Sequence, residues 1–366
     1  MSKFEMMKPN RRDLLKTMAA AGVTYSVLPM ISKPAMASGE VHYHTWAGYD
    51  EPGLLQGYID KHGGMPEISH ISSEEESLAK MMAGWSPDVM HPGNYNVQRW
   101  YDAGLLQPVD TARAKNWPDI FSSIHKEETA QVNGQQYMIP SEFGNSSVVY
   151  RTDLVDEKYQ QENSWAILFD EKYKGRVAQY DSADSLVQCA ALVLGMKNIY
   201  TLDDKQLAEV KKFLNMQREL LRFYWSSPTE MEQAMASGEI VAAYSWNQSL
   251  VTLKKQGIAV DMMVPKEGIF TWIAGFVIHK DCKNLDAAYD LIDAWTSPES
   301  GSWLIDNYGY GSTNSKAYDM LPKERLAELG LSDANKVLDG SLFFKALAPE
   351  FDRKYSDIVI EVQAGG

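Results

Sequence analysis

Aromatic side chains in loops are the groups of this chain best placed for binding chemistry. Trp46 and Tyr49 follow a predicted strand at residues 41–45, and Tyr95 follows another at residues 88–90. Each loop leads into an amphipathic helix, so each is a strand-to-helix loop at the carboxyl edge of a parallel sheet, where ligands bind. We therefore expect these three rings to contact a ligand.

Another aromatic residue, Trp272, lies in the middle of a predicted buried strand. Residues 269–278 carry no charge and are rich in β-branched and aromatic side chains, and Gly268 supplies the turn before them. Gly275 indicates that another strand or a ligand approaches the backbone closely.

Catalytic and metal-binding patterns are absent from the sequence. It contains no His-Glu-x-x-His, no Gly-x-Ser-x-Gly and no Cys/His cluster. His42 and His44 share one strand face, but no third metal ligand lies nearby in the sequence. We predict no metal, no cofactor and no enzyme activity; a periplasmic hydrolase or lyase remains the alternative, and turnover of a ligand would reveal it.

The charge balance excludes general binding to nucleic acid or anionic lipid. The 366 residues, enough for two domains, carry a formal charge of −14. Residues 1–37 hold six Lys or Arg and two acids, which leaves −18 on the remainder. Such a surface keeps a protein dispersed and weakly attracts cations. Two cysteines, Cys189 and Cys282, exclude a disulfide scaffold and leave room for one bridge at most.

The N-terminal segment has the features of an export signal. Arg11 and Arg12 precede an apolar stretch at residues 18–31 and the small-x-small sequence Ala35-Met36-Ala37. The paired arginines are typical of the twin-arginine type, and the apolar stretch is too short for a stable membrane span. We expect cleavage after Ala37 and a periplasmic mature protein.

An ordered series of motifs along nearly the whole mature chain resembles the periplasmic polyamine-binding proteins of ABC importers. The series comprises Trp46, Tyr49 and 52–55; Pro92 and Tyr95; 173–176; Gly238-Glu239; 245–247; 264–268 and Trp272; Gly309-Tyr310 and Asn314. The resemblance implies an α/β, two-lobed type II periplasmic binding protein fold that closes on a small-molecule ligand in a cleft. It also implies partnership with a membrane permease and an ATPase, and we expect a monomer.

The resemblance also implies the course of the chain between the lobes. Crossings are expected near residues 142–146, 271–275 and 315–318. The first lobe would then hold residues 38–142 and 274–315, and the second lobe residues 143–273 and 316–366.

The family's aromatic positions match this chain, whereas its carboxylate positions do not. The matching rings are Trp46, Tyr49, Tyr95, Trp246, Trp272 and Tyr310. Where the family carries an Asp, this chain has Ala274, and the loop acid beside the first-strand Trp is replaced by Ala47 or Gly48. A C-terminal amide of the family is replaced by Phe343, which we also expect to bind the ligand. At the second-lobe helix start, an acidic pair aligns with Ser182 and Ser185, or after a shift of one residue with Asp181 and Asp184.

This chain lacks the family's carboxylates at several positions but retains its aromatic rings, a combination that favours a methylated onium ligand. A primary ammonium needs carboxylate acceptors when desolvated, whereas a quaternary ammonium or sulfonium has no N–H and is held by ring faces. We therefore expect an aromatic cage for dimethylsulfoniopropionate or a betaine. Donors for its carboxylate would come from Ser72, Ser73, Asn94, Asn145, Ser182 and Ser185. The alternative is a polyamine, putrescine or spermidine, bound by Asp181 and Asp184. The two ligand classes are distinguished by whether these aspartate side chains face the cleft.

Overall fold

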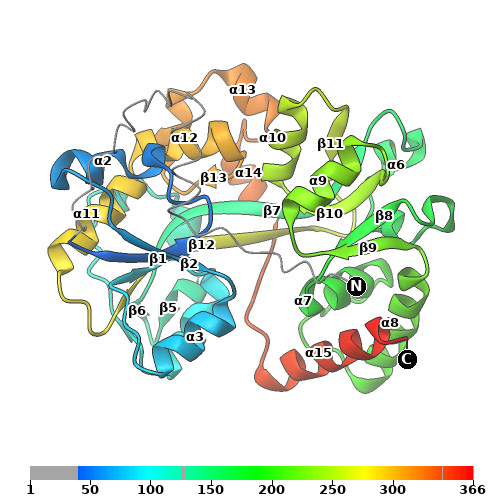
Figure 1. The fold of residues 1–366 in the computed structure, drawn as a ribbon, viewed down its shortest axis with the longest axis horizontal. Helices are drawn as coiled ribbons and strands as arrows, with labels where there is room; N and C mark the ends of the chain where they lie inside the picture. Colours follow the sequence, from blue (N-terminus) through cyan, green and yellow to red (C-terminus); the bar gives the residue numbers. More distant parts are fainter. Residues whose placement is uncertain (1–39, 126–127, 340, 366) are drawn as a thin grey trace, which may run out of the picture. The chain divides into compact units, whose positions relative to one another are not determined.

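The computed structural model describes residues 40–365, apart from 126, 127 and 340. The predicted signal segment and its cleavage site lie outside the described residues. Two groups of elements, here called the first and second lobes, are joined by long strands (Figure 1).

The first lobe is built on parallel strands with β1 in the middle, between β2 and β3. Its elements are β1 (His42–Trp46), α2 (Pro52–His62), β2 (Glu67–Ile71), α3 (Glu74–Met82), β3 (Val89–Met90), α4 (Val97–Asp102), β4 (Leu106–Gln107), α5 (Ser122–His125), β5 (Gln131–Val132), β6 (Gln135–Gln136), α11 (Leu285–Trp295) and α12 (Pro298–Tyr308). The two strand-to-helix units predicted from residues 41–45 and 88–90 are confirmed, so their loops meet at one sheet edge.

The second lobe contains a sheet in which β8 lies between β9 and β10, parallel to both. Its elements are α6 (Glu157–Glu162), β8 (Val177–Tyr180), α7 (Ala183–Val193), α8 (Asp204–Arg218), β9 (Leu221–Trp225), α9 (Pro228–Ala236), β10 (Ala242–Trp246), α10 (Asn247–Lys255), β11 (Val260–Met262) and α15 (Pro349–Gln363). Helix α15 packs against α7 and α8 (Figure 1).

Two long antiparallel strands, β7 (Ile139–Arg151) and β12 (Ile269–His279), pair with each other in the middle of one continuous sheet, between the β2-β1-β3 strands of the first lobe and the β10-β8-β9 strands of the second. Each is almost wholly buried, which explains the uncharged run that predicted β12. Trp272 lies opposite Gly144, where an added Cβ would come within 2.2 Å of the indole ring. The crossings expected near 142–146 and 271–275 lie within these strands.

We propose that the third crossing lies later in the chain than residues 315–318. Apolar side chains from Ala317 to Leu338, including those of α13 (Lys323–Glu328) and α14 (Ala334–Asp339), pack in the core of the first lobe. The chain then pairs with β12 through β14 (Ser341–Phe343) before α15. We therefore propose a lobe boundary at β14, rather than at 315–318.

Some predicted elements differ from the structure. The amphipathic pattern of residues 204–222 predicts one long helix, but the helix ends at Arg218, and aromatic Phe223, Tyr224 and Trp225 follow in β9, since they pair with β8. The sequence predicts strand-like segments at 136–140 and 147–150, which in the structure are one strand, β7, together with the short β6. Residues 333–362 are predicted to be mostly helical, with Phe343 and Phe344 on an apolar turn, whereas in the structure residues 341–343 form β14.

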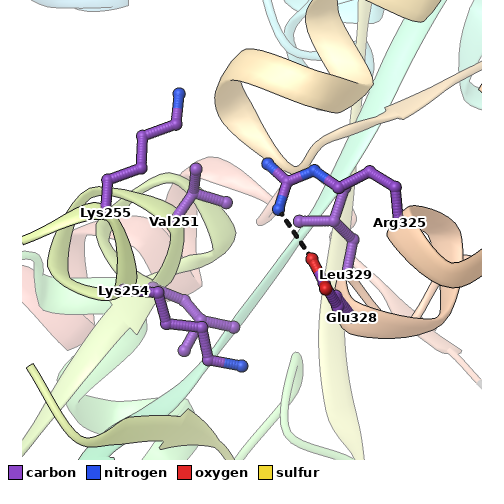
Figure 2. A pocket seen from close by; sticks show the side chains of 7 residues that line it. Val251, Lys254, Lys255, Arg325, Glu328 and Leu329 are labelled. Carbon is purple, nitrogen blue, oxygen red and sulfur yellow. Dashed lines mark hydrogen bonds and ion pairs between the residues drawn. The ribbon is translucent and has the colours of Figure 1, made fainter. Parts of the chain in front are cut away.

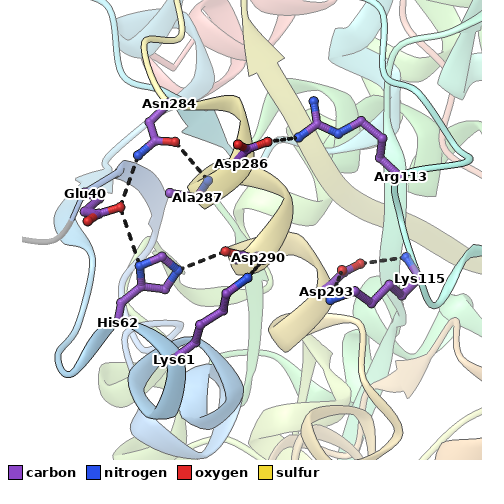
Figure 3. A network of polar contacts seen from close by, with 10 residues as sticks. All are labelled: Glu40, Lys61, His62, Arg113, Lys115, Asn284, Asp286, Ala287, Asp290 and Asp293. Atoms are coloured by element: carbon purple, nitrogen blue, oxygen red, sulfur yellow. Dashed lines mark hydrogen bonds and ion pairs between the residues drawn. The ribbon is translucent and has the colours of Figure 1, made fainter.

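Helix α11 is attached to the surface of the first lobe by acidic side chains one or two turns apart (Figure 3). The N···O distances are 2.6 Å for Arg113–Asp286, 2.6 Å for Lys61–Asp290, 3.0 Å for His62–Asp290 and 3.3 Å for Lys115–Asp293. Burial raises the pKa of Asp290, but hydrogen bonds from Lys61 and His62 outweigh it, so the pKa is lowered. These contacts fix α11, whose Trp295 lies in the core.

Candidate ligand-binding site

Four aromatic side chains form a continuous row on the first lobe, here called the ring row. Tyr49 stacks with Tyr308 at 6.1 Å, Tyr308 meets Tyr310 at 6.1 Å, and Tyr310 meets Trp272 edge-to-face at 4.8 Å between ring centroids. Three of these were predicted from sequence, and Tyr308 was missed. Its position just before the predicted Gly309-Tyr310 loop was the available signal.

The other two predicted tryptophans, Trp46 and Trp246, are the last residues of β1 and β10. Trp46 is half-buried at the end of β1 and packs against the first-lobe core. Trp246, at the end of β10, packs against the cores of both lobes and meets Tyr180 at 5.0 Å. Trp246 therefore lies where the lobes adjoin.

Tyr95 and Phe344 make a second contact between the lobes. The Tyr95 ring lies over Gly93 and is 6.2 Å from the Phe344 ring, which stacks on Phe270 at 5.2 Å. We predicted Phe343 instead, but its side chain packs towards the first-lobe core. The alternation of side chains along β14 explains the difference, and only strand register could have revealed it.

Among the predicted acids, Asp184 faces the other lobe and Asp181 does not. Asp181 is exposed and accepts a hydrogen bond from Gln363 of α15 at 2.7 Å. Asp184 is half-buried and has no hydrogen bond or ion pair to the described residues. Burial, followed by the charges of Asp352 and of Glu75 in the first lobe, raises its pKa to about 6. Asp184 also contributes to the raised pKa of Tyr95, after burial and Glu74.

The two serines at the same helix start have different surroundings. Ser182 is the N-cap of α7, yet its side chain makes no capping hydrogen bond. Ser185 is buried, and its hydroxyl donates to the Tyr244 hydroxyl at 3.2 Å. Ser185 is therefore occupied within the second lobe.

Glu74 holds the loop that carries Tyr95. Its carboxylate accepts from the Gly93 backbone N–H at 2.7 Å and from the Asn96 amide at 2.5 Å. Burial raises the pKa of Glu74 to about 7 against the lowering effect of these hydrogen bonds. The side chain is a positioning group beneath Tyr95.

Most other predicted donors are engaged in local structure. Ser73 caps α3 by accepting from the Glu76 N–H at 3.1 Å, and exposed Ser72 donates to the Glu76 carboxylate. Asn145 donates from its backbone to Asn247 at 2.6 Å and from its amide to Thr271 at 2.7 Å. Asn94 donates to Thr129 at 2.5 Å, while its buried Oδ1 has no hydrogen bond to the described residues.

Sequence reasoning missed Glu142, a carboxylate directly opposite Ala274 in the β7–β12 register. Its side chain is fully buried and lies 3.1 Å from His91 Nε2. The sequence did mark this residue, because Glu142 is the one acidic residue in the otherwise uncharged part of β7 before Arg151. Its pairing with Ala274 was not visible from the sequence.

The histidines considered for a metal are instead bonded to serines. His42 and His44 contact Ser69 Oγ at 2.8 and 2.9 Å, and His44 Nε2 contacts Ser77 Oγ at 2.9 Å. Within residues 40–365, apart from the three undescribed positions, no group of three or more His, Cys, Asp or Glu is arranged to hold a metal. Cys189 and Cys282 are both free.

Two cavities lie away from these rings. One, of about 240 Å³, is bordered by α10 and α13; Figure 2 shows Arg325 and Glu328 paired at 3.2 Å in its wall. The other, of about 300 Å³, lies between the end of α3 and the end of β12 and includes Trp85 and His279. Neither is lined by the side chains predicted to bind ligand.

The family model for bacterial extracellular solute-binding proteins matches residues 66–329, most of the chain. This chain belongs to that family. A membrane-crossing helix is not found in the described part of this solute-binding protein.

Similar proteins of known name support the assignment. The spermidine/putrescine-binding periplasmic protein of Escherichia coli K12 is 26% identical over 338 residues, covering 91% of this chain and 93% of its own. Spermidine/putrescine-binding periplasmic protein 1 of Haemophilus influenzae is 25% identical over 315 residues, covering 84% of each chain. The solved substrate-binding protein PotD of a Streptococcus pneumoniae spermidine/putrescine ABC transporter aligns with a TM-score of 0.76 at 22% identity, covering 90% and 99%. This likeness confirms the predicted two-lobed fold.

Proposed function

We propose that this solute-binding protein delivers a small ligand from the periplasm to the permease and ATPase of an ABC importer. The names of the relatives, periplasmic binding proteins, support both the location and the transport role. Two lobes joined by β7 and β12 can close on one ligand by bending at these strands. The ligand is then released unchanged, so no catalytic group is required.

The ligand we propose is an aliphatic amine of the polyamine class. Asp184 carries this proposal, because it is a half-buried carboxylate that faces the first lobe without a partner among the described residues. A desolvated carboxylate is costly until it is paired, and an ammonium group supplies both charge and N–H donors. The relatives named for spermidine and putrescine support the same class.

The rings supply the remaining affinity for such a ligand. The ring row and the Tyr95–Phe344 contact offer apolar faces for a methylene chain and negative ring faces for the ammonium ends. A cation over one such ring gains about 0.5–2 kcal/mol, depending on desolvation. Several rings and one carboxylate are together sufficient for micromolar binding, which corresponds to about 8 kcal/mol.

A methylated onium zwitterion is the second candidate. Ala274 supplies no carboxylate beside Trp272, and the uncapped Ser182 hydroxyl at the start of α7 could donate to the ligand's acid end. However, Asp184 lies in the first turn of the same helix and repels that acid. The surroundings of α7 therefore favour the amine over the zwitterion.

Isothermal titration tests the proposal. The mature protein, freed of ligand by unfolding and refolding, is titrated with putrescine, spermidine, glycine betaine, dimethylsulfoniopropionate and choline. We expect one-to-one binding of an amine that Asp184→Asn weakens about 10- to 100-fold, as for loss of a charged hydrogen bond. The matched variant Asp181→Asn should leave affinity unchanged. Binding of a betaine or dimethylsulfoniopropionate alone would establish the second candidate instead.

A further inference from the structure

Glu142 is a buried carboxylate with an uneven set of hydrogen bonds. Its side chain is fully buried on β7. Oε2 accepts from the Ser141 hydroxyl and lies 3.1 Å from His91 Nε2. Oε1 is equally near to Nε2 but has no hydrogen bond to the described residues.

The surroundings of His91 explain why one carboxylate oxygen is left over. The Tyr43 hydroxyl lies 2.8 Å from His91 Nδ1 and can donate its hydrogen there. Nε2 then carries the single ring hydrogen, which is shared between Ser141 Oγ at 2.9 Å and Glu142 Oε2 at 3.1 Å. One carboxylate oxygen, Oε1, is thus left as an unused acceptor.

The carboxylate lies beside the ring row. Residues directly opposite each other in an antiparallel pair project to the same face, so Glu142 projects beside Ala274, two residues from Trp272. Tyr49 and Tyr310, only 7% and 6% exposed, lie near enough to Glu142 for its charge to act on them, and the Tyr49 hydroxyl is within hydrogen-bonding reach of its side chain. Burial, followed by the charge of Glu142, raises the pKa of each of these tyrosines.

We propose that Glu142 is a second cation-binding point of the ligand site, with Oε1 accepting from an ammonium group that enters between Tyr49 and Tyr310. The inference rests on the proposed amine-binding function. Ala274 adds only a methyl group opposite Glu142, so no side chain on β12 competes for this oxygen. One end of the ligand binds Asp184 and the other binds Glu142, which selects ligands with at least two ammonium groups.

Paired titrations of a diamine and a monoamine test this assignment. The probes are putrescine and n-butylamine, the latter measured by competition against putrescine if its own heat is small. Glu142→Gln keeps the shape and one acceptor for His91. We expect this variant to raise the Kd of putrescine at least tenfold and that of n-butylamine less than twofold. Asp184→Asn should weaken both amines.

Each outcome has a separate meaning. An unchanged putrescine Kd in Glu142→Gln, or an equal loss for both amines, overturns the Glu142 assignment and makes the residue structural. Wild-type protein that binds neither amine overturns the proposed function itself. If Glu142→Gln does not fold, Glu142→Asp moves the charge back by one methylene, and the same selective loss for putrescine is expected.

Discussion

Two carboxylates, Asp184 and Glu142, carry the same charge in opposite kinds of surroundings. Asp184 starts a helix of the second lobe, is half-buried, and has no partner among the described residues. Glu142 lies on β7, in the middle of the sheet that joins the lobes, and is fully buried with His91 and Ser141 against one of its oxygens. A ligand therefore meets Asp184 as a carboxylate without a partner in the described part of the chain, whereas Glu142 is held in place by its partners and offers the ligand only its second oxygen.

The largest expected effect comes from removing the partner of Glu142. His91→Ala deletes a buried hydrogen-bond donor and the ring that stacks on Phe276 at 4.4 Å. We expect the free energy of unfolding to fall by about 3–5 kcal/mol, the usual cost of leaving one member of a buried pair alone. Urea denaturation measures the loss. His70→Ala, at a half-exposed site, should cost less than about 1 kcal/mol; equal losses would remove the contrast between the two carboxylates.

Asp184→Asn should raise the free energy of unfolding of the ligand-free protein, whereas His91→Ala lowers it. The raised pKa means that the folded state binds the proton more tightly than the unfolded state. The contribution of protonated Asp184 to the free energy of unfolding is present at low pH and is lost as the pH rises through about 6. At pH 7.5 we therefore expect the variant to be more stable than wild type by about 1 kcal/mol, with no gain at pH 3.5. A stability loss at pH 7.5 would show that Asp184 is paired in solution.

Ligand affinity should follow the same titration. An ammonium group binds the ionised form of Asp184, so affinity rises with pH until the carboxylate is fully ionised. We expect amine binding to be about tenfold weaker at pH 5 than at pH 7.5. Glu74, whose pKa is about 7, titrates nearby, so Asp184→Asn is the necessary control and should flatten most of the pH dependence. A pH-independent wild type would place the ligand elsewhere.

The smallest expected effect concerns a carboxylate away from both sites. Asp290 on α11 has a lowered pKa because Lys61 and His62 donate to it. The contribution of ionised Asp290 to the free energy of unfolding is present when the pH is above the pKa of this carboxyl in the unfolded chain. It is lost as the pH falls through the lower pKa of the folded protein. Asp290→Asn should cost about 1 kcal/mol or less at pH 7 and nothing at pH 2, as measured by urea denaturation. Amine affinity should not change.

Much of the fold could be predicted because its signals are local. The uncharged β-branched run of β12 and the glycine-bounded loops after β1 and β3 are visible in short windows of sequence. The failures, β9 and β14, are short strands whose stability comes from pairing with distant strands. Such pairing outweighs local propensity, so a window of sequence cannot show it.

The sequence by itself determined the two-lobed α/β family and put aromatic residues on the loops that meet at the sheet edges. Tertiary structure alone decided which acid faces the other lobe, because Asp181 precedes α7 and is engaged by Gln363 of α15, whereas Asp184 lies in the first turn of α7. It also decided that Phe344 meets Tyr95 and that Glu142 lies opposite Ala274. These outcomes depend on strand register and helix rotation, which are fixed only when distant segments pack together.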